Sequence, residues 1–128
     1  MSGEYYRVRI VNSAKKDLRQ IGKKYGRNTY ETIRDLILDL EFNPEQKGEP
    51  LHARLHGLHS RHYSRFRIIY RIDGKNLVVI VVGAGFHESD SRSDIYRSIE
   101  RLIESGKLII RDEAIRNLEE DSKSSGEA

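Results

Sequence analysis

Two apolar runs joined by a turn signal constrain most strongly what this chain can fold into. The first run, Phe66–Ile72, is apolar apart from two arginines that a strand would place on one face, and the second, Asn76–Val82, is almost wholly apolar. Asp73-Gly74 between them is typical of the tight turn in a β-hairpin. We therefore predict two adjacent antiparallel strands, the second of them central in a sheet, and we expect Gly83-Ala84-Gly85 to end that strand.

The residues before this hairpin predict a strand followed by two helices. Tyr6–Val11 alternates apolar and basic residues, as a half-buried strand does, and Asn12-Ser13 can cap a helix over Ala14–Lys24. Asn28-Thr29-Tyr30-Glu31 resembles a capping box that opens a second helix, which Asn43-Pro44 stops. Four apolar residues at i, i+3, i+4 and i+7 give this second helix one apolar stripe: Ile33, Leu36, Ile37 and Leu40.

The rest of the chain completes an α+β pattern. His59–Tyr63 predicts a strand that a turn at Ser64-Arg65 joins to the hairpin, and Ile95–Glu104 predicts a third helix. The order is therefore β-α-α-β-β-β-α, a mostly antiparallel sheet with a helical hairpin on one face. We assign residues 1–105 to one domain and residues 106–128 to a C-terminal extension, partly helical and then disordered. Within the extension we expect a strand at Lys107–Arg111, a helix at Ala114–Glu120 and disorder over Ser122–Ala128.

The segment His52–Arg71 is basic and contains no acidic residue. It holds five arginines and four of the chain's five histidines, although charged residues make up 34% of the sequence. The whole chain carries a net charge of only +3, but the residues from Asp112 onward contain six acids and two bases, so residues 1–111 carry +7. Such an array implies a polyanionic partner, and RNA or DNA is the obvious one.

The composition excludes several classes of protein. The chain has no cysteine, which excludes disulfides and thiolate chemistry. No apolar run approaches the roughly 20 residues of a membrane span, and the N-terminus lacks the apolar region of a signal peptide. The clustered histidines have no carboxylates or thiols beside them, so we expect neither a structural metal nor another cofactor. We predict a soluble cytoplasmic protein.

Short motifs in a fixed order along residues 5–105 resemble one known family. They are Tyr6-x-Val8-x-Ile10, Ala14-Lys15-x-Asp17-Leu18, Asn43-Pro44, Gly48-x-Pro50-Leu51, Leu55-x-Gly57-Leu58-x-Ser60, Phe66-Arg67-Ile68-Ile69-Tyr70-Arg71-Ile72-Asp73, Val81-Val82-Gly83 and Asp94-Ile95-Tyr96. Through them the chain is similar to the RelE/ParE superfamily of toxins, the toxic half of bacterial type II toxin–antitoxin pairs. The strand Phe66–Asp73, within the β-α-α-β-β-β order, is the most specific of these motifs.

The resemblance implies a cognate antitoxin as a partner and leaves two activities open. Members similar to RelE cut messenger RNA in the ribosomal A site, whereas members similar to ParE poison DNA gyrase. The shared fold does not choose between them, so the site residues must. We interpret the chain as closer to RelE: a metal-independent endoribonuclease that acts on mRNA at the ribosome and inhibits translation. The alternatives are a non-catalytic gyrase inhibitor and a degenerate member that only binds its antitoxin.

Arg67 and Tyr96 are the residues that the resemblance assigns to the site. Arg67 matches the arginine that RelE-like toxins place in the middle of the sheet to bind the transition-state phosphate, and a guanidinium offers paired donors for this purpose. Tyr96 matches the family's C-terminal tyrosine, which stacks on a base or assists proton transfer. The alternative interpretations are an arginine that contacts the antitoxin and a tyrosine that packs the third helix onto the sheet.

The chain departs from RelE-like members at several of the family's site positions. Leu58 and Ser60 stand where RelE carries two lysines, and His62 stands where many relatives have an arginine. The arginine expected shortly after the Val-Gly pair is absent, and His87 or Arg92 are the candidates to replace it.

The histidines offer a different acid–base set. With a pKa of about 6.5, imidazole exchanges protons at neutral pH. His62 and His87, together with Arg61, therefore join Arg67 and Tyr96 as catalytic candidates, and strand periodicity predicts that Ser60 and His62 share a face. Each histidine can equally be an ordinary surface residue, and the arginines can equally contact an acidic antitoxin. Our candidates for binding the RNA backbone are Arg54, Arg65, Arg71 and Arg92.

Overall fold

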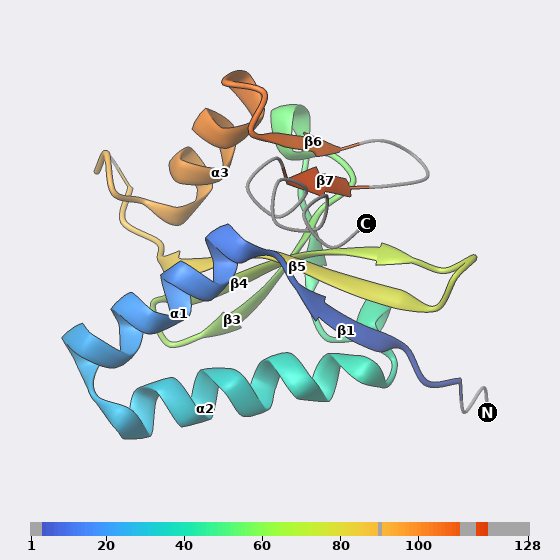
Figure 1. Ribbon diagram of the computed structural model, residues 1–128, viewed down its shortest axis with the longest axis horizontal. Helices are drawn as coiled ribbons and strands as arrows, with labels where there is room; N and C mark the ends of the chain where they lie inside the picture. Colours follow the sequence, from blue (N-terminus) through green and yellow to red (C-terminus); the bar gives the residue numbers. More distant parts are fainter. Residues whose placement is uncertain (1–3, 90, 111–114, 118–128) are drawn as a thin grey trace, which may run out of the picture.

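A five-stranded sheet forms the centre of the computed structural model, which describes residues 4–89, 91–110 and 115–117 (Figure 1). Its strands are β1 (Arg7–Ile10), β2 (Glu49–Pro50), β3 (His59–Tyr63), β4 (Phe66–Asp73) and β5 (Val78–Phe86). They lie in the order β1-β5-β4-β3-β2, with β1 parallel to β5 and the other neighbouring pairs of this sheet antiparallel. The predicted α+β order and the mostly antiparallel sheet are confirmed.

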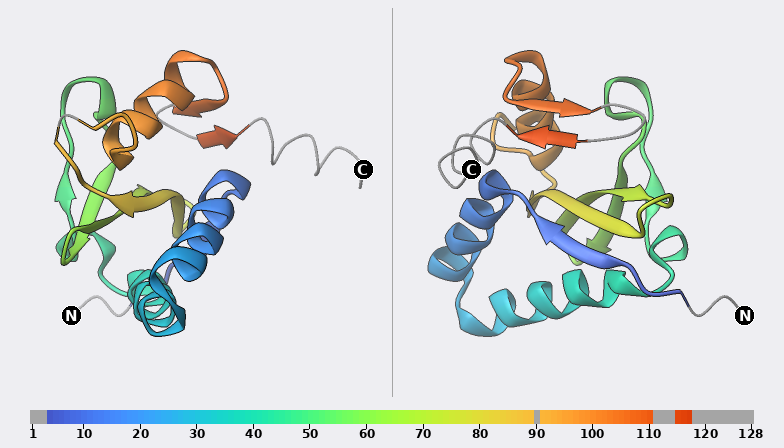
Figure 2. Two further views of the ribbon diagram at one scale, coloured as in Figure 1. Left: turned by 90° about the vertical axis from the view of Figure 1, so that its left-hand side faces the viewer. Right: turned by 45° about the vertical axis from the view of Figure 1, so that its right-hand side comes forward.

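Helices cover both faces of this sheet, as Figures 1 and 2 show. α1 (Asn12–Tyr25) and α2 (Arg27–Leu38) form the predicted hairpin on one face, and α3 (Ile95–Glu104) lies on the opposite face with the bounds that the sequence predicts. The connection from α2 to β3 contains three short 3₁₀ helices: η1 (Asp39–Glu41), η2 (Pro44–Gln46) and η3 (Ala53–Leu55).

The apolar stripe of the second helix is confirmed. Ile33, Ile37 and Leu40 are 0% exposed, and Leu36 is partly buried against the same core. Burying each of these side chains contributes about 1.5–3 kcal/mol, so the stripe holds α2, and the 3₁₀ turn after it that contains Leu40, against the core.

The predicted helix caps are wrong. α1 begins at Asn12 with Val11 as its N-cap, and α2 begins at Arg27 after Gly26, whose φ of 96° turns the chain between the two helices. Neither cap residue makes a side-chain hydrogen bond, and Glu31 of the expected capping box instead accepts from Arg27 Nε at 3.0 Å. The glycine reverses the chain with so few residues that α2 starts before the predicted cap.

The sequence predicts that the second strand of the central hairpin ends at Gly83-Ala84-Gly85. This prediction is wrong, because β5 continues to Phe86. A Cβ at Gly83 would lie 2.6 Å from Ile99 Cδ1, and one at Gly85 would lie 3.4 Å from Ile95 Cβ. The glycines therefore do not break β5; they leave room for α3 to pack directly on its backbone.

A buried tyrosine attaches the polar loop after α2 to the sheet. Tyr70 is 0% exposed, its hydroxyl donates to the Pro44 carbonyl at 2.8 Å, and burial raises the pKa of this hydroxyl to about 12. A Cβ at Gly48 would lie 2.4 Å from the same hydroxyl, so the loop packs against Tyr70 at the position of a glycine.

The C-terminal residues add a small hairpin beyond α3. β6 (Leu108–Ile110) confirms the predicted strand at Lys107–Arg111, and Leu108 is 1% exposed. β6 pairs antiparallel with β7 (Ile115–Asn117), so the helix predicted at Ala114–Glu120 is wrong for residues 115–117. Its other residues and Ser122–Ala128 lie outside the described residues, and the domain boundary at residue 105 stays a prediction.

Asp17 completes the hydrogen bonding of β5 where β1 ends. The last residue of β1, Ile10, pairs with Val81, and three residues further along β5 the backbone N–H of Ala84 donates to Asp17 Oδ2 at 3.1 Å. Burial raises the pKa of this carboxyl to about 6, although the hydrogen bond from Ala84 opposes the rise. The folded protein therefore binds a proton at Asp17 more tightly than the unfolded chain does.

This raised pKa predicts a specific pH dependence of stability. The contribution of protonated Asp17 is fully present below about pH 4 and is lost as the pH rises through about 6. We expect the free energy of unfolding of the wild-type protein, minus that of Asp17→Asn, to fall by about 2 kcal/mol between pH 4 and pH 7. Urea unfolding at several pH values measures it, and a pH-independent difference would contradict the assignment.

Candidate active site

Arg67 is the second residue of the middle strand, β4, and lies on the sheet face opposite the helical hairpin. It pairs across β3 with His62 and across β5 with Gly85. Residues directly opposite each other in antiparallel strands share a face, so the His62 imidazole stands beside the arginine and Gly85 adds no side chain on the other side. Ser60 lies two residues along β3 and shares this face, as predicted.

The guanidinium of Arg67 is held in place by the turn that precedes its strand. Nη1 donates to the Ser64 carbonyl at 3.0 Å and to the Phe66 carbonyl at 2.9 Å. Nε is buried and has no hydrogen-bond acceptor within the described residues. An unsatisfied buried donor costs about 1–3 kcal/mol, and because Nε is shielded from solvent an anionic oxygen would reach it only after the side chain shifts.

Tyr96 reaches the same face from α3. Its hydroxyl lies 2.8 Å from Ser60 Oγ, and the His87 ring meets the tyrosine ring edge-on with centroids 4.8 Å apart. His87 directly follows β5, and its backbone N–H donates to the Arg65 carbonyl at 2.8 Å. Four predicted site residues are thus brought together: Arg67, His62, Tyr96 and His87.

Two further residues belong to this cluster that sequence reasoning did not assign to it. The sequence predicts the face on which Ser60 lies but no role for it, yet it is 1% exposed and hydrogen-bonds Tyr96. Asp94, 3% exposed, lies 2.7 Å from His87 Nδ1. The sequence does indicate that Asp94 is a capping residue, because it stands immediately before a predicted helix and aspartate is a preferred N-cap.

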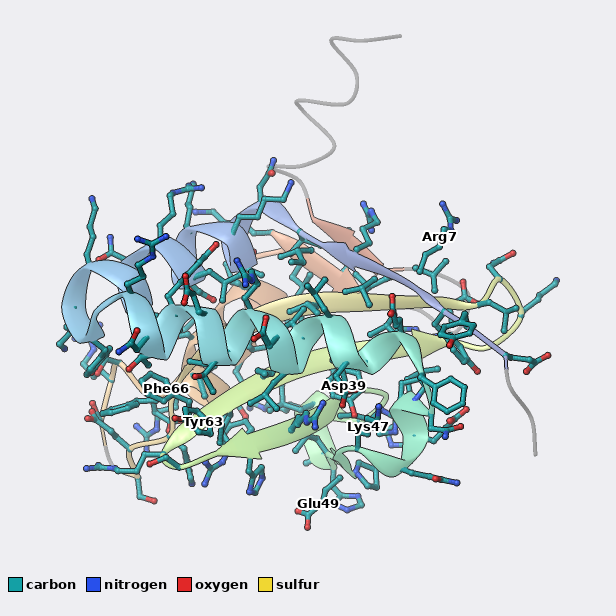
Figure 3. All side chains as sticks on the ribbon, turned by 90° about the horizontal axis from the view of Figure 1, so that it is seen from below. Arg7, Asp39, Lys47, Glu49, Tyr63 and Phe66 are labelled. Carbon is teal, nitrogen blue, oxygen red and sulfur yellow. The ribbon has the colours of Figure 1, made fainter. Side chains whose placement is uncertain are left out.

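Arg61 does not lie with Arg67, and its prediction as a catalytic residue is not supported by its position. Nη1 donates to the Leu36 carbonyl at 2.9 Å and to Asp39 Oδ2 at 3.0 Å, so the side chain faces the helical hairpin. Lys47 Nζ lies 2.9 Å from the same carboxylate, and Figure 3 shows Asp39 and Lys47 together near the end of α2. Hydrogen bonds from Lys47 and Arg61 lower the pKa of Asp39 despite some burial.

The predicted RNA-binding arginines are spread around the site. Arg65 is exposed and stacks its guanidinium 5.1 Å from the centroid of Phe86, whereas Arg71 is half-buried on β4. Arg54 forms an ion pair with Glu104, and Arg92 is exposed in the loop before α3. Of these four, Arg65 and Arg71 are on or next to the strand that carries Arg67.

An aromatic cluster under the first residues of β4 supports the site from the opposite face. Phe66 and Phe86 have ring centroids 4.5 Å apart, and Tyr25 of α1 lies within 5.1 Å of both. Tyr63 stacks on Phe66 with centroids 6.3 Å apart, and Figure 3 shows these two residues side by side. These contacts fix the strand ends on either side of Arg67.

The described residues hold no group of three potential metal ligands, and among their helices none is long and apolar enough to cross a membrane. The side chains gathered at the site are a guanidinium, two imidazoles, a phenol and a buried hydroxyl.

Known proteins match both the sequence and the fold. The profile of the ParE toxin of type II toxin–antitoxin systems, parDE, matches residues 8–87. Toxin RelG of Mycobacterium tuberculosis is 30% identical over 92 residues, which are 72% of this chain and 97% of that protein. Toxin RelE of the same bacterium is 34% identical over 77 residues, 59% of this chain and 76% of that protein.

Solved structures of toxins also resemble this fold. The RelBE2 toxin–antitoxin complex of M. tuberculosis superposes with a TM-score of 0.59 at 24% identity, covering 66% of this chain and 94% of that chain. The YoeB/ParE toxin of Agrobacterium tumefaciens gives 0.55 at 27% identity, covering 64% and 99%. Fold and sequence thus define a small toxin domain. The chain belongs to the RelE/ParE superfamily of type II toxin–antitoxin toxins.

The position of Arg61 predicts a structural effect of its removal. Arg61→Ala takes away hydrogen bonds to a helix carbonyl and to Asp39, so we expect the free energy of unfolding to fall by about 1–3 kcal/mol. Arg34→Ala, which removes an exposed arginine from α2, should change it by less than about 0.5 kcal/mol. Chemical unfolding followed by circular dichroism measures both, and equal effects would show that Arg61 has no such role.

Proposed function

We propose that this protein is a metal-independent endoribonuclease that cleaves messenger RNA at the ribosome and so inhibits translation. The observation that carries the proposal is the position of Arg67, half-buried between two imidazole-bearing segments with an unsatisfied Nε. A guanidinium held in this way suits the charge that develops on a phosphate during transfer.

The reaction needs three groups. The RNA 2′-OH attacks its own 3′-phosphate, a base takes the hydroxyl proton, cations neutralise the phosphoryl oxygens, and an acid protonates the 5′ oxygen as the P–O5′ bond breaks. Arg67 supplies the cation. His62 and His87 supply acid and base, since imidazole can perform either role near neutral pH.

The two imidazoles are spaced to serve opposite sides of one phosphate. His62 belongs to β3, on one side of β4, and His87 follows β5, on the other side. Adjacent strands lie about 4.8 Å apart, so the two backbones are separated by about 10 Å with Arg67 between them. In-line displacement requires the attacking and leaving oxygens on opposite sides of the phosphorus, which this spacing accommodates.

Tyr96 and Ser60 take the place of the two missing family lysines in this proposal. The tyrosine ring offers a surface on which a base can stack, and the hydrogen bond to Ser60 fixes its orientation. The RNA backbone on either side of the cut is then within reach of Arg65 and Arg71.

A cognate antitoxin is the second partner that we propose. A toxin structurally similar to this chain was solved in complex with its antitoxin. The basic face around Arg67 would attract an acidic polypeptide by the same charges that attract RNA, so one surface would serve inhibitor and substrate. Because messenger RNA is translated in the cytoplasm, we expect this protein to act there.

The alternative is inhibition of DNA gyrase, which the match to the ParE profile favours. Pulse labelling in cells that express the chain separates the two activities. We expect methionine incorporation to stop within minutes while thymidine incorporation continues. Early arrest of DNA synthesis with induced DNA damage would favour the gyrase activity instead.

Arg67→Ala tests the centre of the proposed site. Loss of the phosphate-binding guanidinium should lower the rate of RNA cleavage by about 10²–10³-fold, with an unchanged circular dichroism spectrum. Arg34→Ala is the matched control, because Arg34 is exposed on α2 and hydrogen-bonds its neighbour Asp35. Equal cleavage by the Arg67 variant and the wild type, measured with end-labelled RNA on ribosomes, would refute the role of Arg67.

A further inference from the structure

We propose that Asp94 is a positioning residue that holds the His87 imidazole as its Nδ1–H tautomer, leaving Nε2 as the nitrogen that accepts a proton. This inference rests on the proposed ribonuclease function for its role in a reaction. Its structural part concerns one hydrogen bond and is tested independently of any activity.

The Asp94 carboxylate is buried and surrounded by donors. Oδ1 lies 2.7 Å from His87 Nδ1 and accepts from the Glu88 N–H at 2.6 Å. Oδ2 accepts from the N–H groups of Tyr96 at 3.0 Å and Arg97 at 3.3 Å. Burial alone would raise the pKa of this carboxyl, but the hydrogen bonds from His87 and the backbone hold it below its usual value.

An ionised carboxylate fixes which imidazole nitrogen carries the proton. A carboxylate can only accept hydrogen bonds, so the short contact between Oδ1 and Nδ1 requires the proton on Nδ1. In neutral His87 the lone pair is then on Nε2, at the far side of the ring from Asp94. The His87 side chain is 36% exposed and the Asp94 side chain is 5% exposed, and the His87 ring meets the Tyr96 ring edge-on, so the imidazole lies between the buried aspartate and the tyrosine of the site.

Capping the helix does not by itself require a carboxylate. Asn and Ser satisfy the first N–H groups of a helix as well as Asp does. In this protein the second oxygen of Asp94 is used for His87 and Glu88, outside the helix. One side chain therefore fixes the beginning of α3, which carries Tyr96, and the ring orientation of His87.

The orientation can be read directly by NMR. Long-range ¹H–¹⁵N correlation spectra of ¹⁵N-histidine protein distinguish the two neutral tautomers, and His87→Ala identifies the resonance among the five histidines. We expect the Nδ1–H tautomer for His87 in the wild-type protein. The Nε2–H tautomer, or an equal mixture, would overturn the proposal whether or not the protein cuts RNA.

Asp94→Ser separates positioning from capping. The serine hydroxyl can cap Tyr96 and Arg97 but supplies no second oxygen to His87, so we expect the helix content to be retained and the His87 resonance to shift toward the tautomer mixture. The cleavage rate should fall by about 10²-fold, whereas the affinity for RNA should stay within about twofold. An unchanged tautomer or an unchanged cleavage rate would overturn the role of Asp94.

Two further variants keep the result interpretable. Asp94→Asn places an amide against Nδ1 and should also remove the preference for the Nδ1–H tautomer. Asp73→Asn lies at an exposed turn where the carboxylate hydrogen-bonds Asn76, so it should change neither the His87 tautomer nor the cleavage rate. If wild-type protein cuts no RNA but shows the Nδ1–H tautomer that Asp94→Ser loses, the positioning contact stands and only the ribonuclease function fails.

Discussion

The packing of α3 on the glycine-containing end of β5 is the contact on which the site depends. Gly83 and Gly85 have no side chains, so Ile99 and Ile95 approach the strand backbone directly. Tyr96 follows Ile95 on the same helix, and its hydroxyl is thereby placed 2.8 Å from Ser60. Asp94 ends the preceding loop in the position that meets His87. A Cβ at Gly83 would lie 2.6 Å from Ile99 Cδ1 and would force that side chain to shift, whereas a Cβ at Gly85 would meet Ile95 at ordinary contact distance.

Basic side chains have different partners on the two faces of the sheet. Arg61 and Lys47 form ion pairs with Asp39 near the end of α2, where they stabilise the attachment of the helical hairpin. Arg67 instead hydrogen-bonds backbone carbonyls only, so its charge is not neutralised by a carboxylate within the described residues. The same residue type therefore has a structural role on one face and is available to a phosphate on the other.

Sequence periodicity predicted the elements well and the contacts between them poorly. The bounds of α3 and β3 and the buried stripe of α2 follow from local patterns, which depend only on neighbouring residues. The continuation of β5 through its glycines and the inward direction of Arg61 depend on helices distant in sequence. His62, Arg67 and Tyr96 could be named from the resemblance, but the contacts of Ser60 and Asp94 required the register of the sheet and the placement of α3.

The most direct test of the central claim uses ribosomes programmed with an mRNA that carries a single 2′-deoxy nucleotide at the cleaved position. If Arg67 and its imidazoles promote attack by the 2′-OH, the unmodified message gives a 2′,3′-cyclic phosphate and a 5′-OH end, and the modified message is not cut there. Cleavage of the deoxy position at the same rate, or a 5′-phosphate product, would contradict the account.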